Sequence, residues 1–245
     1  MIDKMLLAQL EDAAEISKKR PHFIGFLNEE EWVAAEDYLR GRRDISYTAW
    51  GGFPQAHRRL AGFFPPFQEP NPQVFPLRGL TFRFSKQVSL SHRDFLGAFM
   101  ALGVERSAVG DILIEEGRCV AFVRSELLLY FESNLTAVGK TAVAMTEGFD
   151  EPLPSADSFA ELSGVVASQR LDGIVAFLMR TSREKAANFV KAGHVSVNHR
   201  EITSGARPLQ EGDIVSIRKC GRFIIDRLGP LTAKGRMKIQ CRKYQ

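Results

Sequence analysis

Two stretches within residues 1–75 carry apolar side chains at helical spacing, separated by polar and turn-forming residues. In the first, the apolar positions follow the i, i+3, i+4, i+7 pattern of an amphipathic helix: Leu6, Leu7, Leu10, Ala13, Ala14 and Ile16. A second helix is predicted to begin at Asn28, because Glu31 three residues later completes a capping box. The run from Phe63 to Pro72 contains four prolines and predicts an irregular connector. These features predict a mainly helical N-terminal domain over residues 1–75.

Residues 76–150 show a different alternation, in which short apolar strands are interspersed with two helical stretches. Helices are predicted to start near Ser91 and Leu127, and strands are predicted over four segments: 80–84, 111–114, 118–123 and 141–146. The order β-α-β-β-α-β is that of a ferredoxin-like fold, which many RNA-recognition domains share. The aromatic signature of RNA stacking is weak, because Cys119 stands where a stacking ring is expected.

The remaining sequence divides into a linker and a third domain. Residues 151–162 are acidic and contain prolines, which is typical of a linker. Residues 163–245 predict a small domain with one helix starting at Arg170 and a second helix capped by Thr181 and ending at Gly193. Short strands follow these helices. The predicted fold class is therefore α+β, with a helical, a ferredoxin-like and a small C-terminal domain.

The net charge of +4 is distributed unevenly along the chain. Residues 163–245 contain 16 Lys and Arg against 6 Asp and Glu, whereas residues 1–162 contain 17 against 23. A basic block of this size on an acidic body predicts a module that binds a polyanion. A solvated basic face is the alternative interpretation, and charge alone does not separate RNA from DNA or anionic lipid.

Composition argues against several other classes of protein. No window approaches 18 uncharged apolar residues, so no transmembrane helix and no membrane partner are expected. Acidic residues interrupt the first 20 positions, which argues against a secretory signal. Cys119, Cys220 and Cys241 form no CxxC or Cys/His ligand spacing. We therefore expect no metal site, no cofactor and a reducing cytoplasmic location.

The basic domain supplies the candidate RNA contacts. Basic and polar side chains near its helix ends and turns are expected to bind phosphates and to position RNA without reading its sequence: Arg170, Arg183, Lys185, Lys191, Asn198, His199, Arg200, Lys219, Arg222, Lys234 and Arg236. Asp172 is expected to be structural and to pair with a nearby arginine. His194 is expected to pack or to face solvent. Four further arginines are interpreted as solvated surface, with a second RNA contact as the alternative: Arg58, Arg59, Arg83 and Arg93.

The C-terminal sequence resembles the RNA-binding domain of small-subunit ribosomal protein S-four. The resemblance rests on five segments at a specific spacing: Arg170-Leu171-Asp172, Ser182-Arg183-x-x-Ala186, Gly193-x-Val195-x-Val197-Asn198, Gly212-Asp213-x-Val215-Ser216-Ile217 and Gly221-Arg222. One position departs from it, because His199 follows the asparagine where many members of that superfamily have glycine. The resemblance implies an S-four-type fold for residues 163–245.

The whole chain is similar to the YlmH family of bacterial proteins. The similarity covers nearly all of residues 45–245, and its upstream motifs are Gly51-Gly52-Phe53, His57-Arg58-Arg59, Leu90 to Ala98, Leu102-Gly103 and Gly110-Asp111-Ile112. The resemblance implies a non-catalytic RNA-binding protein that binds rRNA and peptidyl-tRNA on the large ribosomal subunit. It also implies a role in ribosome-associated quality control of stalled nascent chains. We expect the protein to be a monomer.

Two other functions stay open. Arg170-Leu171-Asp172 is similar to the catalytic aspartate motif of pseudouridine synthases, several of which carry an S-four domain. An RNA-modifying enzyme that uses this domain for delivery is therefore one alternative, although the Thr-Ser-Gly continuation of that motif is missing here. A cell-division adaptor is the other, since genes of the family often neighbour cell-division genes. In that case the acidic N-terminal part would bind cell-division proteins.

Overall fold

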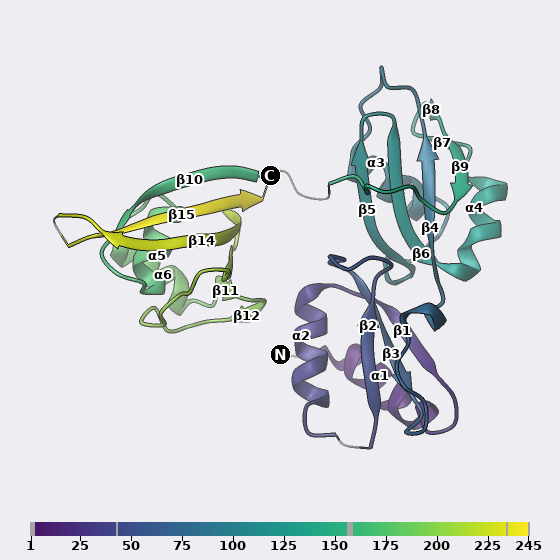
Figure 1. The fold of residues 1–245 in the computed structure, drawn as a ribbon, viewed down its shortest axis with the longest axis horizontal. Coiled ribbons are helices and arrows are strands. Elements are labelled where there is room, and N and C mark those ends of the chain that lie inside the picture. Colours follow the sequence, from purple (N-terminus) through teal and green to yellow (C-terminus); the bar gives the residue numbers. More distant parts are fainter. Residues whose placement is uncertain (1–2, 43, 156–158, 234, 245) are drawn as a thin grey trace. The chain divides into compact units, whose positions relative to one another are not determined.

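The chain folds into two compact units, unit 1 (Met1–Ala156) and unit 2 (Asp157–Gln245). Unit 1 contains two parts, each built around its own sheet, whereas unit 2 is built around a single larger sheet (Figure 1). This computed structural model describes the following residues: 3–42, 44–155, 159–233 and 235–244.

The first part of unit 1 combines two helices with a three-stranded antiparallel sheet in the order β1-β3-β2. In chain order its elements are α1 (Lys4–Ser17), β1 (His22–Leu27), α2 (Glu29–Leu39), β2 (Ser46–Trp50) and β3 (Arg59–Phe64). Asn28 caps α2 as predicted. Its side-chain oxygen accepts a hydrogen bond from the backbone N–H of Glu31 at 2.9 Å, and the Glu31 carboxylate accepts from the backbone N–H of Asn28 at 2.7 Å.

This part is a mixed α/β structure and not the mainly helical domain that the sequence predicted. Both predicted helices are present, but three strands accompany them. Strand β3 escaped the sequence analysis because it is buried on both faces from Leu60 to Phe64. Such a strand forms a continuous apolar run and lacks the alternation that identifies a half-buried strand. The irregular connector that was predicted to begin at Phe63 therefore begins after Phe64.

The second part of unit 1 has a four-stranded antiparallel sheet in the order β5-β6-β4-β9. Its elements are β4 (Leu77–Arg83), α3 (His92–Ala101), β5 (Val109–Glu115), β6 (Arg118–Arg124), α4 (Leu128–Asn134), β7 (Ala137–Val138), β8 (Thr141–Ala142) and β9 (Ala144–Glu147). Both predicted helices and the first three predicted strands are present. The predicted last strand, 141–146, is divided between β8 and β9 by Val143, whose backbone N–H donates to the carbonyl of Thr136 at 3.0 Å.

Both faces of this four-stranded sheet are buried. On β6, Cys119 and Ala121 pack in the same core cluster as the apolar residues of α3 and α4. The alternate residues Val120 and Phe122 pack instead in a cluster that includes residues of the first part. The rings of Phe122 and Phe53 are stacked, with centroids 5.0 Å apart. A shared hydrophobic core therefore joins the two parts of unit 1.

Unit 2 has a six-stranded antiparallel sheet in the order β10-β15-β14-β13-β11-β12. Its elements are β10 (Phe159–Val166), α5 (Leu171–Leu178), α6 (Arg183–Lys191), β11 (Val195–Val197), β12 (Arg200–Glu201), β13 (Ile214–Ile217), β14 (Gly221–Leu231) and β15 (Met237–Tyr244). Helices α5 and α6 pack against one face of this sheet (Figure 1). Phe223, Ile225 and Cys241 point into that face and are buried.

Two boundaries in unit 2 differ from the sequence prediction. β10 begins at Phe159, inside the segment 151–162 that was predicted as linker, and it pairs along its whole length with β15. The partner strand lies about 80 residues away in sequence, so local composition does not reveal this pairing. Ser182, and not Thr181, caps α6, because its hydroxyl accepts from the backbone N–H of Lys185 at 3.3 Å.

Candidate RNA-binding surface

A buried carboxylate organises two of the predicted RNA contacts in unit 2. Asp172, in the first turn of α5, is 6% exposed. A distance of 2.8 Å joins Arg170 Nη2 to Asp172 Oδ2, and a distance of 3.0 Å joins Arg183 Nη2 to Asp172 Oδ1. The prediction that Asp172 pairs with a nearby arginine is therefore confirmed. The carboxylate fixes two guanidinium groups that come from the starts of two different helices.

The local chain explains why Asp172 can be buried as an anion. Its position in the first turn of α5 places it near the positive end of the helix dipole. Its backbone N–H donates to the carbonyl of Gly205 at 3.0 Å, which holds the loop after β12 against this turn. Burial opposes ionisation of Asp172, but the hydrogen bonds from Arg170 and Arg183 outweigh burial and lower its pKa. The carboxylate is therefore charged at neutral pH.

The same pairing leaves both arginines directed to solvent. The side chains of Arg170 and Arg183 are 43% and 55% exposed. Two cations on one anion leave a net positive charge, and each guanidinium has five N–H donors, more than the carboxylate can accept. Lys185 is also exposed, two residues after Arg183 on α6. We call Arg170, Asp172, Arg183 and Lys185 the Asp172 surface, which can bind a phosphate group through charge-assisted hydrogen bonds.

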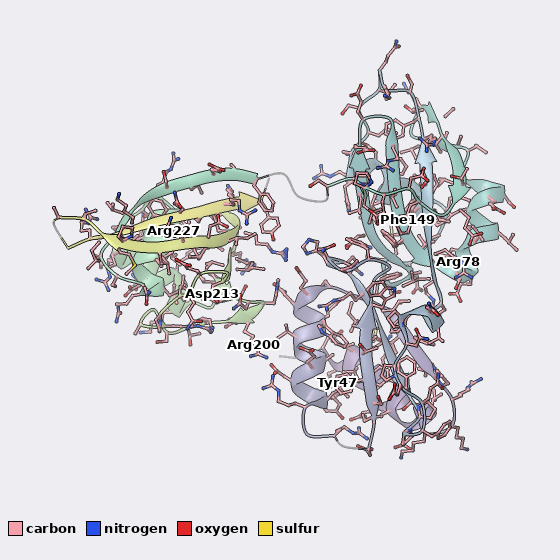
Figure 2. The ribbon with its side chains drawn as sticks, in the orientation of Figure 1. Tyr47, Arg78, Phe149, Arg200, Asp213 and Arg227 are labelled. Carbon is pink, nitrogen blue, oxygen red and sulfur yellow. The ribbon has the colours of Figure 1, made fainter. Side chains whose placement is uncertain are left out.

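The β11–β12 hairpin presents a second group of predicted contacts. Its two turn residues, Asn198 and His199, have positive φ values of 49° and 64°, as a type I′ turn requires. The Asn198 amide donates to Asp213 Oδ1 at 2.7 Å and accepts from the backbone N–H of Ile214 at 2.9 Å. Asn198 therefore fastens the turn to β13. Arg200 extends outward at the end of the hairpin (Figure 2).

The other predicted contacts lie elsewhere on unit 2. Lys219 is in the β13–β14 turn, where the backbone N–H of Arg218 donates to the carbonyl of His194. That end of β11 is opposite the end that carries Asn198. Lys191 ends α6, about 12 Å along the helix axis from Arg183. Lys219 and Lys191 therefore lie away from the Asn198 turn and from the start of α6, respectively.

Arg222 and Arg236 lie farther from the Asp172 surface in the fold. Arg222 starts β14, and its guanidinium lies 5.1 Å from the centre of the Tyr244 ring. Burial lowers the pKa of Arg222. Arg236 is in the β14–β15 turn, at the other end of the 11-residue strand β14, roughly 30 Å from Arg222 along that strand. Lys234 lies outside the described residues.

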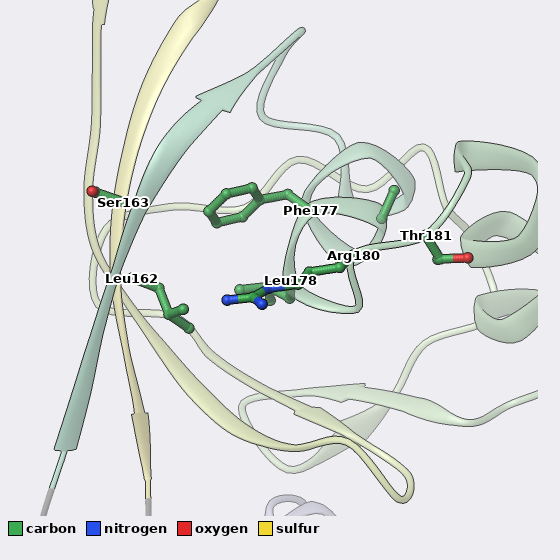
Figure 3. A pocket seen from close by; sticks show the side chains of 7 residues that line it. Leu162, Ser163, Phe177, Leu178, Arg180 and Thr181 are labelled. Atoms are coloured by element: carbon green, nitrogen blue, oxygen red, sulfur yellow. The ribbon is translucent and has the colours of Figure 1, made fainter.

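Sequence reasoning did not identify Arg180 or the pocket beside it. A cavity of about 350 Å³ lies between β10 and the end of α5. Phe177 and Arg180 both reach from the α5 side toward Leu162 and Ser163 of β10 (Figure 3). Arg180 has a positive φ of 51°, which is uncommon for arginine and which no local sequence signal indicates. None of the predicted RNA contacts that the structure describes lines this pocket.

In unit 1, Arg58 of the His57-Arg58-Arg59 motif is partly buried and binds backbone carbonyl groups. Arg58 Nη2 donates to the carbonyl of Phe26 at 2.7 Å, and Arg58 Nε donates to the carbonyl of Val109 at 3.1 Å. Burial lowers the pKa of Arg58. The buried carboxylate of Asp111 accepts from the backbone N–H groups of His57 and Arg58 at 2.6 and 3.2 Å. Arg58 is therefore a partly buried side chain bound to backbone carbonyls, and not the solvated surface residue that was predicted.

The neighbouring predictions have mixed outcomes. The Arg59 guanidinium lies 5.5 Å from the centre of the Trp32 ring, so it packs on an aromatic side chain. Arg83 is exposed and forms an ion pair with Asp150 at 3.3 Å, and Arg93 is also exposed, as predicted for solvated surface. In unit 2 the rings of His194 and Phe189 are 4.8 Å apart, so the prediction that His194 packs or faces solvent is confirmed.

The described residues show no sign of a metal site or of a membrane span. Among them, no group of three or more His, Cys, Asp and Glu side chains is arranged to hold a metal ion. Within the same part of the chain, no helix is long and apolar enough to cross a membrane.

Comparison with known proteins identifies the family. A family model described as "Putative RNA-binding domain in YlmH" matches residues 70–149, and the S4 (S-four) domain model matches residues 169–215. Ribosome-associated protein quality control protein P2 of Bacillus subtilis (strain 168) is 31% identical over 223 residues, which are 90% of this chain and 86% of that protein. The solved structure of cell division protein ylmH from Streptococcus pneumoniae shares the fold over 60% of this chain and 91% of its own, with a TM-score of 0.52 and 19% identity. The chain therefore belongs to the YlmH family of RNA-binding proteins with a C-terminal S4 domain.

Proposed function

We propose that this protein is a non-catalytic factor that binds rRNA and tRNA on the large ribosomal subunit through unit 2. Its role would be ribosome-associated quality control of stalled nascent chains in the cytoplasm, with an obstructed peptidyl-tRNA as the RNA partner. The name of the Bacillus subtilis relative supports the quality-control role, since that protein is called a ribosome-associated quality control protein.

The observation that carries the proposal is the pairing of Arg170 and Arg183 on one buried carboxylate. Free arginine side chains lose much conformational entropy when they bind a phosphate. Here Asp172 has already fixed both guanidinium groups, at 2.8 and 3.0 Å, while about half of each side chain stays exposed. Such preorganised forks suit the closely spaced phosphates of a folded RNA.

In our proposal, the half-buried His199 and the exposed Arg200 of the β11–β12 hairpin extend this surface. His199 and Arg200 follow Asn198, which the bonds to Asp213 and Ile214 hold in place. A rigid hairpin and a fixed arginine pair would recognise the shape and backbone of RNA, because phosphate contacts carry no sequence information. We further propose Lys191, Lys219 and Arg236 as peripheral contacts.

We also propose that the second part of unit 1, about residues 76–150, is a ferredoxin-like domain that contributes to RNA binding. The sheet order β5-β6-β4-β9 supports this assignment, because β6 lies between β4 and β5, the two strands that α3 connects, as in a split β-α-β unit. The sheet face away from α3 and α4 cannot bind RNA, since Val120 and Phe122 on that face are buried. RNA binding by this part would therefore use its loops and edges.

A non-catalytic role agrees with the environment of Asp172. Both oxygens of its carboxylate accept hydrogen bonds from arginine, so it is not placed as an unpaired nucleophile. The pseudouridine synthase alternative requires a modified nucleoside after incubation with transcripts, and a reproducible product would overturn the non-catalytic proposal. A cell-division adaptor would be favoured instead by a pull-down that survives nuclease treatment and deletion of residues 163–245.

Sucrose-gradient sedimentation of the tagged full chain from lysate tests the proposal. Wild type is expected to migrate with large ribosomal subunits. Arg183→Ala/Lys185→Ala is expected to stay near the top of the gradient. Lys18→Ala/Lys19→Ala is the matched control, because it removes the same charge from exposed positions in the turn after α1, outside both matched domains.

Two results would contradict the proposal. If wild type stays at the top of the gradient even at low salt, the ribosome is not its partner. If Arg183→Ala/Lys185→Ala sediments like wild type, the Asp172 surface is not the contact. Binding to purified subunits gives a quantitative check, since the log–log salt slope should be shallower by about 1.4 in the double variant, at about 0.7 for each lost contact.

A further inference from the structure

The six-stranded sheet of unit 2 has a second face that neither α5 nor α6 covers. Along β15, Ile239 and Cys241 point into the helix-covered core, so the alternate residues Gln240, Arg242 and Tyr244 point to the other face. Arg222 on β14 is likewise adjacent to the core residue Phe223 and points away from the helices. This face therefore lies on the side of the sheet opposite the helices.

Two aromatic rings and two guanidinium groups come together at one end of this face. Phe159 of β10 lies directly opposite Tyr244 of β15, and their ring centroids are 4.9 Å apart in an edge-to-face arrangement. The Arg242 guanidinium lies 4.6 Å from the centre of the Phe159 ring, and the Arg222 guanidinium lies 5.1 Å from that of Tyr244. We call these four residues the stacking face. They come from three adjacent strands.

The guanidinium plane of Arg242 is fixed by a neighbour on β14. Asp226 Oδ1 accepts from Arg242 Nε at 2.9 Å and from Nη2 at 2.8 Å, while 40% of the Arg242 side chain stays exposed. A guanidinium held in this way is a flat, preordered surface on which a nucleobase can stack at small entropic cost. Stacking on rings and guanidinium planes is the common mode by which proteins hold unpaired nucleotides.

The charges on this face favour RNA as the occupant. Lys238, two positions before Gln240 on β15, is exposed, and so is Arg236 in the β14–β15 turn. Arg227 of β14 is exposed as well (Figure 2). These cations continue from the stacking face along the strands, as a path for a phosphate backbone requires. Residues 163–245 as a whole carry 16 basic against 6 acidic residues, which complements a polyanion.

We propose that the stacking face binds a segment of unpaired RNA, with bases stacked on Phe159, Tyr244 and the two guanidinium groups. This proposal goes beyond the function proposed above and does not depend on it, because Asp172 lies on α5, on the opposite side of the sheet. Unit 2 would then hold two RNA elements at once: a folded element at the Asp172 surface and a flexible strand at the stacking face.

The test uses the full chain and single-stranded oligoribonucleotides of about eight nucleotides, within the range that one sheet-based module covers. One base is replaced by 2-aminopurine, whose fluorescence falls when it stacks, and affinity is measured by anisotropy. Tyr244→Leu is expected to weaken binding roughly tenfold and to reduce the quenching. Arg242→Lys is expected to weaken binding as well, although it keeps the charge. Tyr244→Phe keeps the ring and is expected to bind like wild type.

Controls separate the two surfaces. Arg183→Ala/Lys185→Ala is expected to bind the oligoribonucleotide within about twofold of wild type, since each distant phosphate contact adds little to a short strand. Tyr244→Leu is expected to sediment with large subunits like wild type. Hydrogen exchange of β13 and β14 peptides verifies that the variants keep the fold of unit 2.

Three outcomes would overturn the proposal. The first is equal affinity and quenching for wild type and Tyr244→Leu. The second is loss of oligoribonucleotide binding in Arg183→Ala/Lys185→Ala instead, which would assign the strand to the Asp172 surface. The third is absence of binding by wild type, or binding only to vesicles of anionic phospholipid. Failure of the ribosomal proposal has a different signature, because it changes sedimentation and leaves the oligoribonucleotide result intact.

Discussion

The two units use arginine in opposite ways. In unit 1, Arg58 is partly buried and donates to the carbonyls of Phe26 and Val109. In unit 2, Arg170 and Arg183 meet on the carboxylate of Asp172, and about half of each side chain is exposed. Carbonyl partners consume the donors of a buried arginine, whereas a single carboxylate below two arginines leaves donors directed outward. The type of partner, and not the charge, thus separates a structural arginine from a candidate RNA contact.

The four-stranded sheet of unit 1 and the six-stranded sheet of unit 2 also differ in how far their faces are covered. The β5-β6-β4-β9 sheet is buried on both faces, because Phe122 stacks on Phe53 on the side away from α3 and α4. The sheet of unit 2 is covered by helices on one face only, and the other face carries Arg242 and Tyr244. A strand order that resembles RNA-recognition domains therefore leaves no open sheet face in unit 1, whereas the open face of the unit 2 sheet is the one that we propose binds RNA.

Removing the shared core of unit 1 has the largest expected effect. Phe122→Ala should destabilise unit 1 by roughly 4 kcal/mol. The ring is fully buried between the two parts of unit 1, so its removal loses apolar contacts and leaves a cavity. Both tryptophans of the chain, Trp32 and Trp50, are in unit 1, so urea unfolding followed by tryptophan fluorescence measures this loss.

Phe223→Ala is the matched control for that measurement. Phe223 is buried in the core of unit 2, so this variant should destabilise unit 2 to a similar extent without moving the tryptophan transition. Circular dichroism should record the unit 2 loss. An unchanged tryptophan transition in Phe122→Ala would show that the two parts of unit 1 do not depend on this contact.

The contrast between arginines gives the next largest effect. Arg58→Met should destabilise unit 1 by roughly 2 kcal/mol, because the Phe26 carbonyl loses the Arg58 donor and the Val109 carbonyl keeps only the hydrogen bond from Arg106. Arg183→Met should cost less than about 1 kcal/mol, since the Arg183 side chain is half exposed and Arg170 still pairs with Asp172. RNA affinity should change in the opposite order. Equal stability losses in the two variants would refute the distinction between buried and presented arginine.

The sequence predicted those features that depend on neighbouring residues. The capping box of Asn28 and Glu31 and the pairing of Asp172 with arginine are local, and both are present. The positive φ of Gly193 at the end of α6 is local in the same way. Such features need only a few residues of context.

The features that the sequence missed depend on distant partners. β3 is continuous and apolar because both of its faces are buried, and β10 is a strand because β15 pairs with it. The side chain of Arg58 is internal because Val109, about 50 residues away, accepts its hydrogen bond. The sequence around Arg58 therefore predicted an exposed surface, whereas in the fold the Arg58 side chain is partly buried and binds carbonyl groups of unit 1.

The next smaller effect concerns Asp172 and pH. Asp172→Asn should destabilise unit 2 by about 1 to 2 kcal/mol at neutral pH, because the negative charge is lost and the amide nitrogen cannot accept a hydrogen bond from either guanidinium. It should also weaken RNA binding, because the guanidinium groups lose their fixed orientation. The measurement is urea unfolding followed by circular dichroism, with tryptophan fluorescence used to identify the unit 1 transition.

The pH dependence of this difference follows from the lowered pKa of Asp172. A carboxyl group whose pKa is lower in the folded state stabilises the fold above its ordinary pKa, about 3.9. That contribution is lost as the pH falls through the folded-state pKa. The stability gap between wild type and Asp172→Asn should therefore be constant near neutral pH and should close in strong acid. A gap that persists at about pH 2 would contradict the assigned cause.

The smallest expected effect has the opposite sign and tests whether the hairpin binds RNA. His199 occupies a turn position with φ of 64°, where glycine is preferred, so His199→Gly should stabilise unit 2 by about 0.5 to 1 kcal/mol. Asn198→Gly is the control, because it also relieves a positive φ but loses the bonds to Asp213 and Ile214 and should destabilise the hairpin. If His199 contacts RNA, His199→Gly should weaken binding to large subunits while raising stability. Backbone strain at the expense of stability often marks a functional residue. If binding is unchanged in His199→Gly, His199 is not part of the RNA surface, and RNA binding does not explain its positive φ.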